Sequence, residues 1–387
     1  MNLSIRRDSS VKQRTYLIVE SGHTGHLLVF VRILARAAVS SGARVTVALT
    51  RAAKDSPEYR LHLLGLSEAV DVATWDGSLS PRALRNLAAR SGATDIVIPH
   101  ADPVVGGLVL GWPLLSHVRL HLLIMRDPRW EKPAPFRRRM KNLAKLAAIR
   151  LVSKTPRARV VWLREPGYRS DNQELSAVDP FVPDGSIAEI EAAAAAARAE
   201  LLGSAPVFWF GITGAISRHK NVALVVEALS RLKSIRPDLP IGFALIGPVG
   251  DNLGITIEGI TKACADAGVP TFIDDRKLSN FEMNAAVGGL DAVVMAYSTH
   301  SPNSTLGKAW ILGTRVVAAG PDSIRRFVRS IDAGFESALT IGGIAGSMSA
   351  AYDAPAPAGR TGALSVTDFA SSVLGIPSSS NSRITHV

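Results

Sequence analysis

The sequence predicts an α/β protein with two doubly wound parallel sheets, and three observations support this prediction. Short apolar runs alternate with helical patterns along the chain, which is typical of βαβ units. The 387 residues suffice for two domains, each with its own core. The alternation starts again after VDPFVPDG at 178–185, where turn-forming residues indicate a linker.

The first half predicts an N-terminal domain over residues 15–180, preceded by a disordered basic arm at 1–14. Its apolar runs predict strands at 15–20, 44–50, 95–100, 119–125 and 159–163. A helix is expected at 27–41, because Leu27, Phe30, Leu34 and Ala38 fall on one face and Gly42 supplies a stop.

The second half repeats this pattern and predicts a C-terminal domain over residues 181–365. Strands are expected at 207–212, 241–246, 271–273, 292–297 and 315–319, and helices at 187–202, 221–234 and 304–312. Residues 366–387 are expected to form one more helix, at 366–374, and a disordered polar end.

Composition excludes several classes of protein. With 47% hydrophobic and 20% charged residues, the chain is not a collagen, a coiled coil or a disordered protein. The single Cys264 excludes an intrachain disulfide and suits a reducing cytoplasm. The opening MNLSIRRDSSVKQR lacks the apolar core of a signal peptide, and Pro113 and Arg119 interrupt the most apolar stretch, 108–125. We therefore expect a cytoplasmic protein without a membrane span.

Positive charge is concentrated between residues 126 and 169. There, 14 Lys or Arg residues accompany three acidic ones, and the resulting net charge of +11 equals that of the whole chain. A helix expected at 135–149 carries Phe136, Met140 and Leu143 on one stripe, with basic residues around it. The pattern fits an anionic membrane surface, with peripheral attachment to the inner membrane face, and equally fits a core helix with a solvated back. No recognition motif supports a specific nucleic-acid partner.

The loops after the strands carry the candidate site residues, because ligands of open parallel sheets bind beyond the carboxyl ends of the strands. The first loop is SGHTGH, between a strand and a helix whose first N–H groups can bind an anion. Its candidate acceptor-binding residues are Gly22, His23, Thr24, Gly25 and His26. A plain strand-to-helix turn is the alternative interpretation.

Two loops of the second half are candidate phosphate sites. GAISRHKN places Gly214, Arg218 and Lys220 between a strand and a helix, where lysine supplies a point charge and arginine a bidentate fork. YSTHSPNSTLGKA begins another helix, where a capping segment and a diphosphate cradle look alike in sequence. The donors expected there are Asn303, Ser304 and Thr305.

A further pair of polar residues follows the strand DIVIPH in the first half. His100 and Asp102 lie just beyond this strand and are candidates for holding an acceptor hydroxyl or sugar. A role in a local turn is the alternative for both residues.

The segment 206–319 resembles the GT-B glycosyltransferases of family 4, also called group 1. The resemblance rests on GAISRHKN, ALIGP and LSNFEMNAAVGGLDAVVMAYSTHSPNSTLGKAWILGTRVVAA. In that family a strand ending in Gly precedes a loop with Arg and Lys, and a later strand leads into a loop with two glutamates. The resemblance implies GT-B architecture, with two Rossmann-like domains facing a central cleft.

The match to the family motif is partial. Lys220 falls on the family lysine that binds the donor diphosphate, but Ala215 stands in place of its partner arginine, for which Arg218 is the expected substitute. His300 and Lys308 occupy the positions of the two glutamates near the donor sugar and the ribose. The resemblance therefore places His300 and Lys308 in the donor site with altered chemistry.

The resemblance implies a retaining, metal-independent hexosyltransferase with no cofactor besides a nucleotide-sugar co-substrate. The expected catalytic residues are Lys220, Arg218, His100 and Asp102. The acceptor is expected to be a sugar, a lipid-linked molecule or a small molecule in the synthesis of a bacterial polysaccharide, glycolipid or glycosylated metabolite. The loss of both glutamates also supports a second hypothesis, a catalytically degenerate GT-B protein that binds a nucleotide or a partner enzyme.

Overall fold

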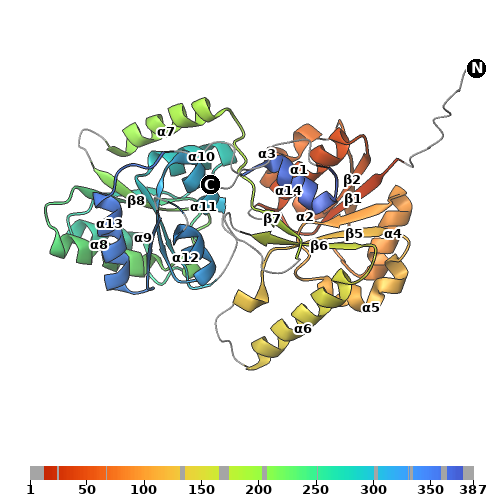
Figure 1. The fold of residues 1–387 in the computed structure, drawn as a ribbon. Coiled ribbons are helices and arrows are strands. Elements are labelled where there is room, and N and C mark those ends of the chain that lie inside the picture. Colours follow the sequence, from red (N-terminus) through yellow and green to blue (C-terminus); the bar gives the residue numbers. More distant parts are fainter. Residues whose placement is uncertain are drawn as a thin grey trace, which may run out of the picture. The chain divides into compact units, whose positions relative to one another are not determined.

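The chain forms two parallel sheets with helices between their strands, which confirms the predicted α/β fold class (Figure 1). The computed structural model describes residues 13–23, 26–66, 68–130, 136–164, 174–202, 207–250, 252–299, 304–329, 331, 334–358 and 364–377. Most of the predicted basic arm and the end of the predicted disordered tail lie outside these residues, as do Thr24, Gly25, His300 and Asn303.

The first sheet has seven strands in the order β3-β2-β1-β4-β5-β6-β7. They are β1 (Thr15–Glu20), β2 (Arg44–Thr50), β3 (Asp71–Trp75), β4 (Asp95–Ile98), β5 (Arg119–Ile124), β6 (Ala158–Arg164) and β7 (Ser176–Val178). The central strands β1 and β4 are buried along their whole length, as continuous apolar runs predict for strands covered on both faces. The strand order reverses between β1 and β4.

In the described part of the first half of the chain, six α-helices accompany this sheet. They are α1 (Leu27–Ser40), α2 (Arg51–Lys54), α3 (Pro57–His62), α4 (Pro81–Ser91), α5 (Val105–Leu115) and α6 (Phe136–Ser153). Local sequence sets the start of α4, because the side chain of Ser80 accepts a hydrogen bond from the Ala83 N–H and Pro81 occupies the first helical position.

The second sheet has six strands in the order β10-β9-β8-β11-β12-β13. They are β8 (Phe208–Thr213), β9 (Ile241–Ile246), β10 (Thr271–Asp274), β11 (Ala292–Ala296), β12 (Arg315–Ala319) and β13 (Gly334–Ser337). Alternate residues serve two cores: Phe210 and Ile212 join one apolar cluster, whereas Trp209 joins the other. Here the strand order reverses between β8 and β11.

Helices α7 to α14 complete the fold. They are α7 (Ile187–Leu202), α8 (Val222–Ile235), α9 (Ile257–Asp266), α10 (Asn280–Gly289), α11 (Ser304–Leu312), α12 (Asp322–Arg329), α13 (Ile341–Asp353) and α14 (Val366–Leu374). A capping box starts α10, because Ser279 accepts from the backbone of Glu282 and Glu282 accepts from the backbone of Ser279.

The chain divides into two compact units. The first holds the residues up to Ile124, Ala144–Val161 and the chain from Ala370, and the second holds Met125–Leu143 and Trp162–Phe369. The end of α14 thus belongs to the first unit: the Val373 carbonyl lies 3.1 Å from Nδ1 of the buried His121, and Arg159 donates to the Ser372 carbonyl at 2.7 Å. None of the described helices is long and apolar enough to cross a membrane.

Candidate functional site

The candidate residues gather at two places, each beside a reversal of strand order. In the second unit these are the loop after β8 and the start of α11, which follows β11. In the first unit they are the loop after β1 and the residues after β4. A reversal of strand order opens a crevice at the carboxyl ends of the two strands, where ligands of such sheets bind.

Lys220 is a buried cation at the second-unit site. It ends the single turn η3 (Arg218–Lys220), between β8 and α8, and is only 5% exposed. Its Nζ donates a hydrogen bond to the carbonyl of Thr213, the last residue of β8. Burial lowers the pKa of Lys220 to about 7, so that the neutral and charged forms are close in free energy at neutral pH.

Two glycines near Lys220 have a positive φ, which favours glycine. Gly214 has a φ of 81°, and a Cβ added there would lie 3.4 Å from Nζ of Lys220. Gly247, just after β9, has a φ of 122°, and its added Cβ would lie 2.6 Å from the Gly214 carbonyl oxygen. Gly247 therefore requires glycine for conformation and for space, whereas Gly214 requires it for conformation.

The first turn of α11 shares a neighbour with Lys220. The hydroxyl oxygen of Thr305 lies 3.4 Å from that of Thr213, and the carbonyl of Thr213 accepts the hydrogen bond from Lys220. The first turn of α11 carries no acidic residue, and the leading N–H groups of a helix attract anions. Lys220, Ser304 and Thr305, three predicted donor residues, therefore belong to one neighbourhood that suits a phosphate.

Arg218 and His219 precede Lys220 in the same turn. Arg218 is exposed, and its predicted pairing with a phosphate stays a prediction. The His219 ring packs edge-on against Tyr297 at 5.6 Å, and its Nδ1 lies 2.5 Å from Oγ of Ser217. Burial, and then the charge of Lys220, lower the pKa of His219. His219 was not among the residues predicted from the sequence, where its adjacency to Lys220 was the available signal.

Lys308 is also buried, but its surroundings differ. Its Nζ donates to Oδ1 of Asn284 and lies 5.8 Å from the ring centre of Phe181. The Asn284 amide in turn donates to two backbone carbonyls of the segment 178–185. Burial lowers the pKa of Lys308 to about 8, although Asp179 and Asp184 act in the opposite direction. These contacts tie α11 to α10 and to that segment, and donor binding by Lys308 stays a prediction.

The first-unit site begins with a buried carboxyl group that was not predicted from the sequence. Glu20 ends β1 and is 2% exposed; its Oε1 accepts from the Gly22 N–H at 2.8 Å, whereas Oε2 has no hydrogen-bond partner among the described residues. Burial raises the pKa of Glu20 to about 7, although hydrogen bonds from the backbone N–H groups of Gly22 and Ser21 act to lower it. An acid at the end of the otherwise apolar run TYLIV was the signal.

Two predicted histidines lie near each other in the first unit. His26 stands just before α1, with its ring 4.8 Å from that of Phe30. Burial, and then the nearby His100, lower the pKa of His26 to about 4, so its imidazole is neutral at pH 7. Gly22 and His23 are half-buried in the same loop. The structure thus brings His26 and His100 within electrostatic range, and acceptor binding there stays a prediction.

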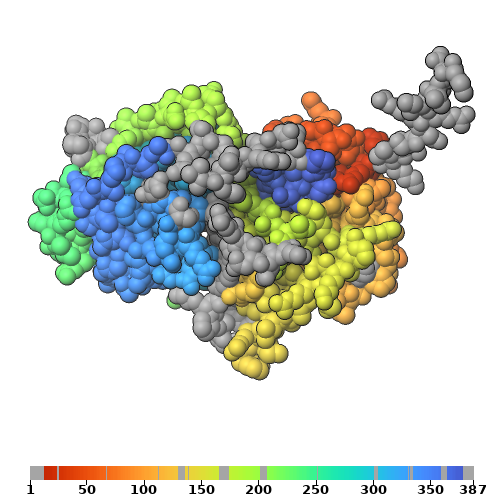
Figure 2. Space-filling model, in the orientation of Figure 1, coloured from red at the N-terminus to blue at the C-terminus, as the bar shows by residue number. Residues whose placement is uncertain are grey.

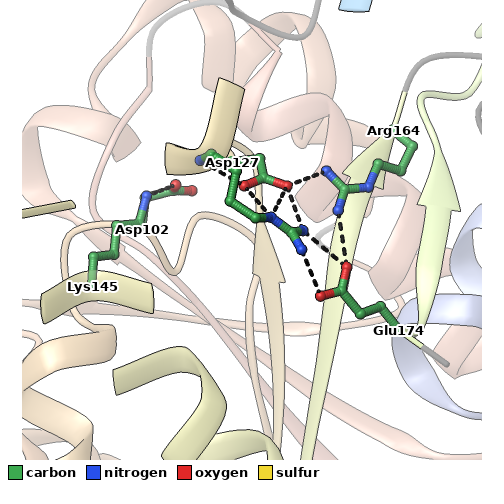
Figure 3. Close-up of polar contacts among 6 residues, drawn as sticks. Asp102, Asp127, Lys145, Arg164 and Glu174 are labelled. Carbon is green, nitrogen blue, oxygen red and sulfur yellow. Dashed lines mark hydrogen bonds and ion pairs between the residues drawn. The ribbon is translucent and has the colours of Figure 1, made fainter. Parts of the chain in front are cut away.

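Asp102 forms an ion pair that the sequence did not indicate. Its carboxylate lies 2.6 Å from Nζ of Lys145 on α6, and the Asp102 side chain is 9% exposed (Figure 3). The pair joins the loop after β4 to α6. Any acceptor bound by Asp102 must share this carboxylate with Lys145.

Two carboxylates and two arginines form a second charged cluster in Figure 3. Asp127 contacts Arg129 at 2.6 Å and Arg164 at 2.9 Å, and Glu174 contacts the same two arginines at 2.9 and 3.3 Å. Both guanidinium groups also lie over the Trp162 ring. Because each carboxylate bonds both cations, we assign the cluster to stability.

The structure shows no metal centre in the parts that it describes: no group of three His, Cys, Asp or Glu residues there is placed to hold an ion.

Comparisons with known proteins concern the fold. No protein-family model matches the sequence, and no curated protein sequence matches it. Among solved structures, sucrose-phosphate synthase from Thermosynechococcus elongatus is similar with a TM-score of 0.62 and 13% identity, covering 94% of this chain and 95% of that one. A glycosyltransferase from Rickettsia africae ESF-5 has a TM-score of 0.61 and 11% identity, covering 88% of both chains.

A third similar structure contains ligands. It is Anabaena HepE in complex with UDP and glucose, with a TM-score of 0.59 and 15% identity over 94% of each chain. At these identities the likeness concerns the fold. Together with the two parallel sheets, it shows that the chain has GT-B architecture, as the sequence resemblance implied.

Proposed function

We propose that the protein is a retaining glycosyltransferase that moves a sugar from a nucleotide diphosphate sugar to an acceptor hydroxyl. The observation that carries the proposal is the buried Lys220 beside the first turn of α11, joined through Thr213. A lysine and a helix start without acidic residues suit a diphosphate, which carries charge on several oxygens. The predicted role of Lys220 in the family motif supports the same assignment.

In the proposed reaction, the bond between the anomeric carbon and the diphosphate oxygen breaks, and a bond from that carbon to the acceptor oxygen forms. The acceptor proton ends on the departing diphosphate. Protonated Lys220 and the N–H groups at Ser304 and Thr305 stabilise the negative charge that develops there. The remaining task of the protein is to position the acceptor, for which His26, His100 and Asp102 of the first unit are the candidates.

The solved structure that contains UDP and glucose makes UDP the first diphosphate to test. Thermal shifts of the protein are measured with UDP, GDP, ADP, TDP and CMP, because a ligand of the native state raises its apparent stability. We expect one diphosphate to raise the melting temperature, and Lys220→Met to lose the shift. A matched control is Lys262→Met, which removes an exposed lysine from α9.

Turnover separates the enzyme from the degenerate alternative. Release of the free diphosphate from a nucleotide-sugar, followed by NMR assignment of the anomeric configuration of the product, tests for retention. Inversion of configuration would refute the retaining mechanism. Diphosphate binding without any turnover would instead favour a nucleotide-binding GT-B protein, for which the altered residues at His300 and Lys308 supply the sequence argument.

A further inference from the structure

Helix α6 exposes an apolar stripe to solvent. Phe136 is 78% exposed, Met140 50%, Leu143 52% and Leu151 57%. At about 100° per residue, these four side chains fall within an arc of about 80°. A helix that packs on a core through its apolar stripe would bury these residues, so the stripe of α6 has another role.

The same helix packs on the protein through a different face. Ala148, Ile149 and Val152 are its buried apolar residues, and they lie about 150° around the helix from the exposed stripe. Lys145 lies on that packing face too, paired with Asp102. The exposed stripe therefore points away from the residues that hold α6 in place, and the solvated-core interpretation of its pattern does not apply.

Positive charge flanks the stripe. Arg137 and Arg139 lie on its two sides, Arg150 lies near its far end, and all three are exposed. The sequence of α6, FRRRMKNLAKLAAIRLVS, contains no acidic residue. In Figure 2 the helix, drawn in yellow, lies at the lower edge of the view with its side chains at the surface. An apolar stripe flanked by arginines complements a surface with an apolar interior beneath an anionic outer layer, because the stripe can insert while the arginines stay at the anionic groups.

We propose that α6 docks the protein on an anionic lipid surface, with Phe136, Met140 and Leu143 inserted at the boundary between headgroups and acyl chains and the flanking arginines on lipid phosphates. Arginine suits this position because its guanidinium binds phosphate bidentately. The helix lies in the plane of the interface. The proposal rests on α6 alone and is independent of the sugar transfer proposed above.

Cosedimentation with vesicles tests the proposal on the full-length protein. We expect binding to vesicles of phosphatidylcholine that contain about 30 mol% phosphatidylglycerol, and binding at least about tenfold weaker to pure phosphatidylcholine. High salt should weaken the binding to the anionic vesicles. Phe136→Ser combined with Met140→Ser and Leu143→Ser is expected to reduce the affinity about tenfold or more. Leu110→Ser, which replaces an 88% exposed leucine on α5, is the matched control.

A fluorescent label locates the helix directly. The only cysteine, Cys264, is buried, so Leu143→Cys offers one accessible thiol for an environment-sensitive dye. We expect its emission to shift to the blue with anionic vesicles, whereas the same dye at Lys262→Cys on α9 stays unchanged.

Three results would overturn the proposal. The first is equal binding to both vesicle types, and the second is binding that the serine variant retains in full. The third is a protein that does not bind vesicles but self-associates in sedimentation velocity, with the self-association lost in the serine variant. A second copy of the chain would then cover the stripe.

Discussion

Lys220 is expected to take up a proton when a diphosphate binds. In the free protein burial holds its pKa at about 7, against 10.5 in solution. A diphosphate beside the amine favours the charged form and moves the pKa back up. At pH 8 about nine tenths of the lysine is neutral before binding, so complex formation should take up about 0.9 proton.

The same linkage predicts the pH dependence of binding. If only the protonated form of Lys220 binds tightly, the apparent Kd rises about 50-fold between pH 7 and pH 9. Titration calorimetry with UDP at pH 8, in buffers of different ionisation enthalpy, measures proton uptake as the slope of observed enthalpy against buffer enthalpy. Normal affinity with a slope of zero would refute the reasoning.

A second buried lysine provides the control. Among the described residues, Lys308, whose pKa lies at about 8, is the other lysine that burial brings close to the working pH. Lys308→Met should leave the proton uptake at about 0.9, whereas Lys220→Met should abolish most of the binding. If Lys308→Met removed the uptake instead, the proton would belong to that site and the diphosphate assignment would fail.

Three further predictions concern stability. Burial raises the pKa of Glu20 from 4.5 to about 7, so the folded state keeps a proton that the unfolded state releases, and stability falls as the pH rises from 4.5 to 7. In urea unfolding, Glu20→Gln should raise the free energy of unfolding by about 3 kcal/mol at pH 8 and by less than about 0.5 kcal/mol at pH 4.5. Gly247→Ala should lower the free energy of unfolding by about 2 kcal/mol or more, because the added Cβ would clash with the Gly214 carbonyl. Asp127→Ala should lower the free energy of unfolding by about 3 to 5 kcal/mol, because the buried Arg164 would lose its nearest carboxylate.

Two matched substitutions test whether the losses at Gly247 and Asp127 come from the stated contacts or from a general sensitivity of the fold to substitution. Gly342→Ala lies in α13 with open space around its Cβ, so it should be neutral or stabilising. Asp266→Ala breaks an exposed ion pair with Lys262 and should change stability by less than about 1 kcal/mol. A large loss in either variant would contradict the explanations given for Gly247 and Asp127.

The central strands could be predicted from sequence, whereas three edge strands could not. β1 and β9 are buried throughout, so their continuous apolar runs give their bounds. The missed strands, β3, β7 and β13, all lie at sheet edges, and their residues are largely half-buried or exposed. An edge strand pairs through one side and needs no apolar run, so its sequence resembles a loop.

The candidate sites show the same division between local and distant information. The order of strand, loop and helix indicated Lys220, which follows the buried strand β8 by seven residues. Thr305, nine residues after β11, was selected because its loop accompanies the Lys220 loop. The partner of Asp102 is Lys145, 43 residues later on another helix, and no local pattern indicates such a pair. The orientation of α6 is likewise a tertiary property: the stripe is visible in the sequence, but the face that packs inward is decided by Ile149 and Val152.

The surroundings of the two buried lysines indicate which one is prepared for an anion. Both are 5% exposed, and burial lowers the pKa of each. The carboxylates of Asp179 and Asp184 partly offset that effect at Lys308. Burial is the cause that lowers the pKa of Lys220, whose Nζ donates a hydrogen bond to the backbone carbonyl of Thr213. A diphosphate would supply the negative charge that this lysine lacks, and for that reason binding should depend on Lys220 rather than Lys308.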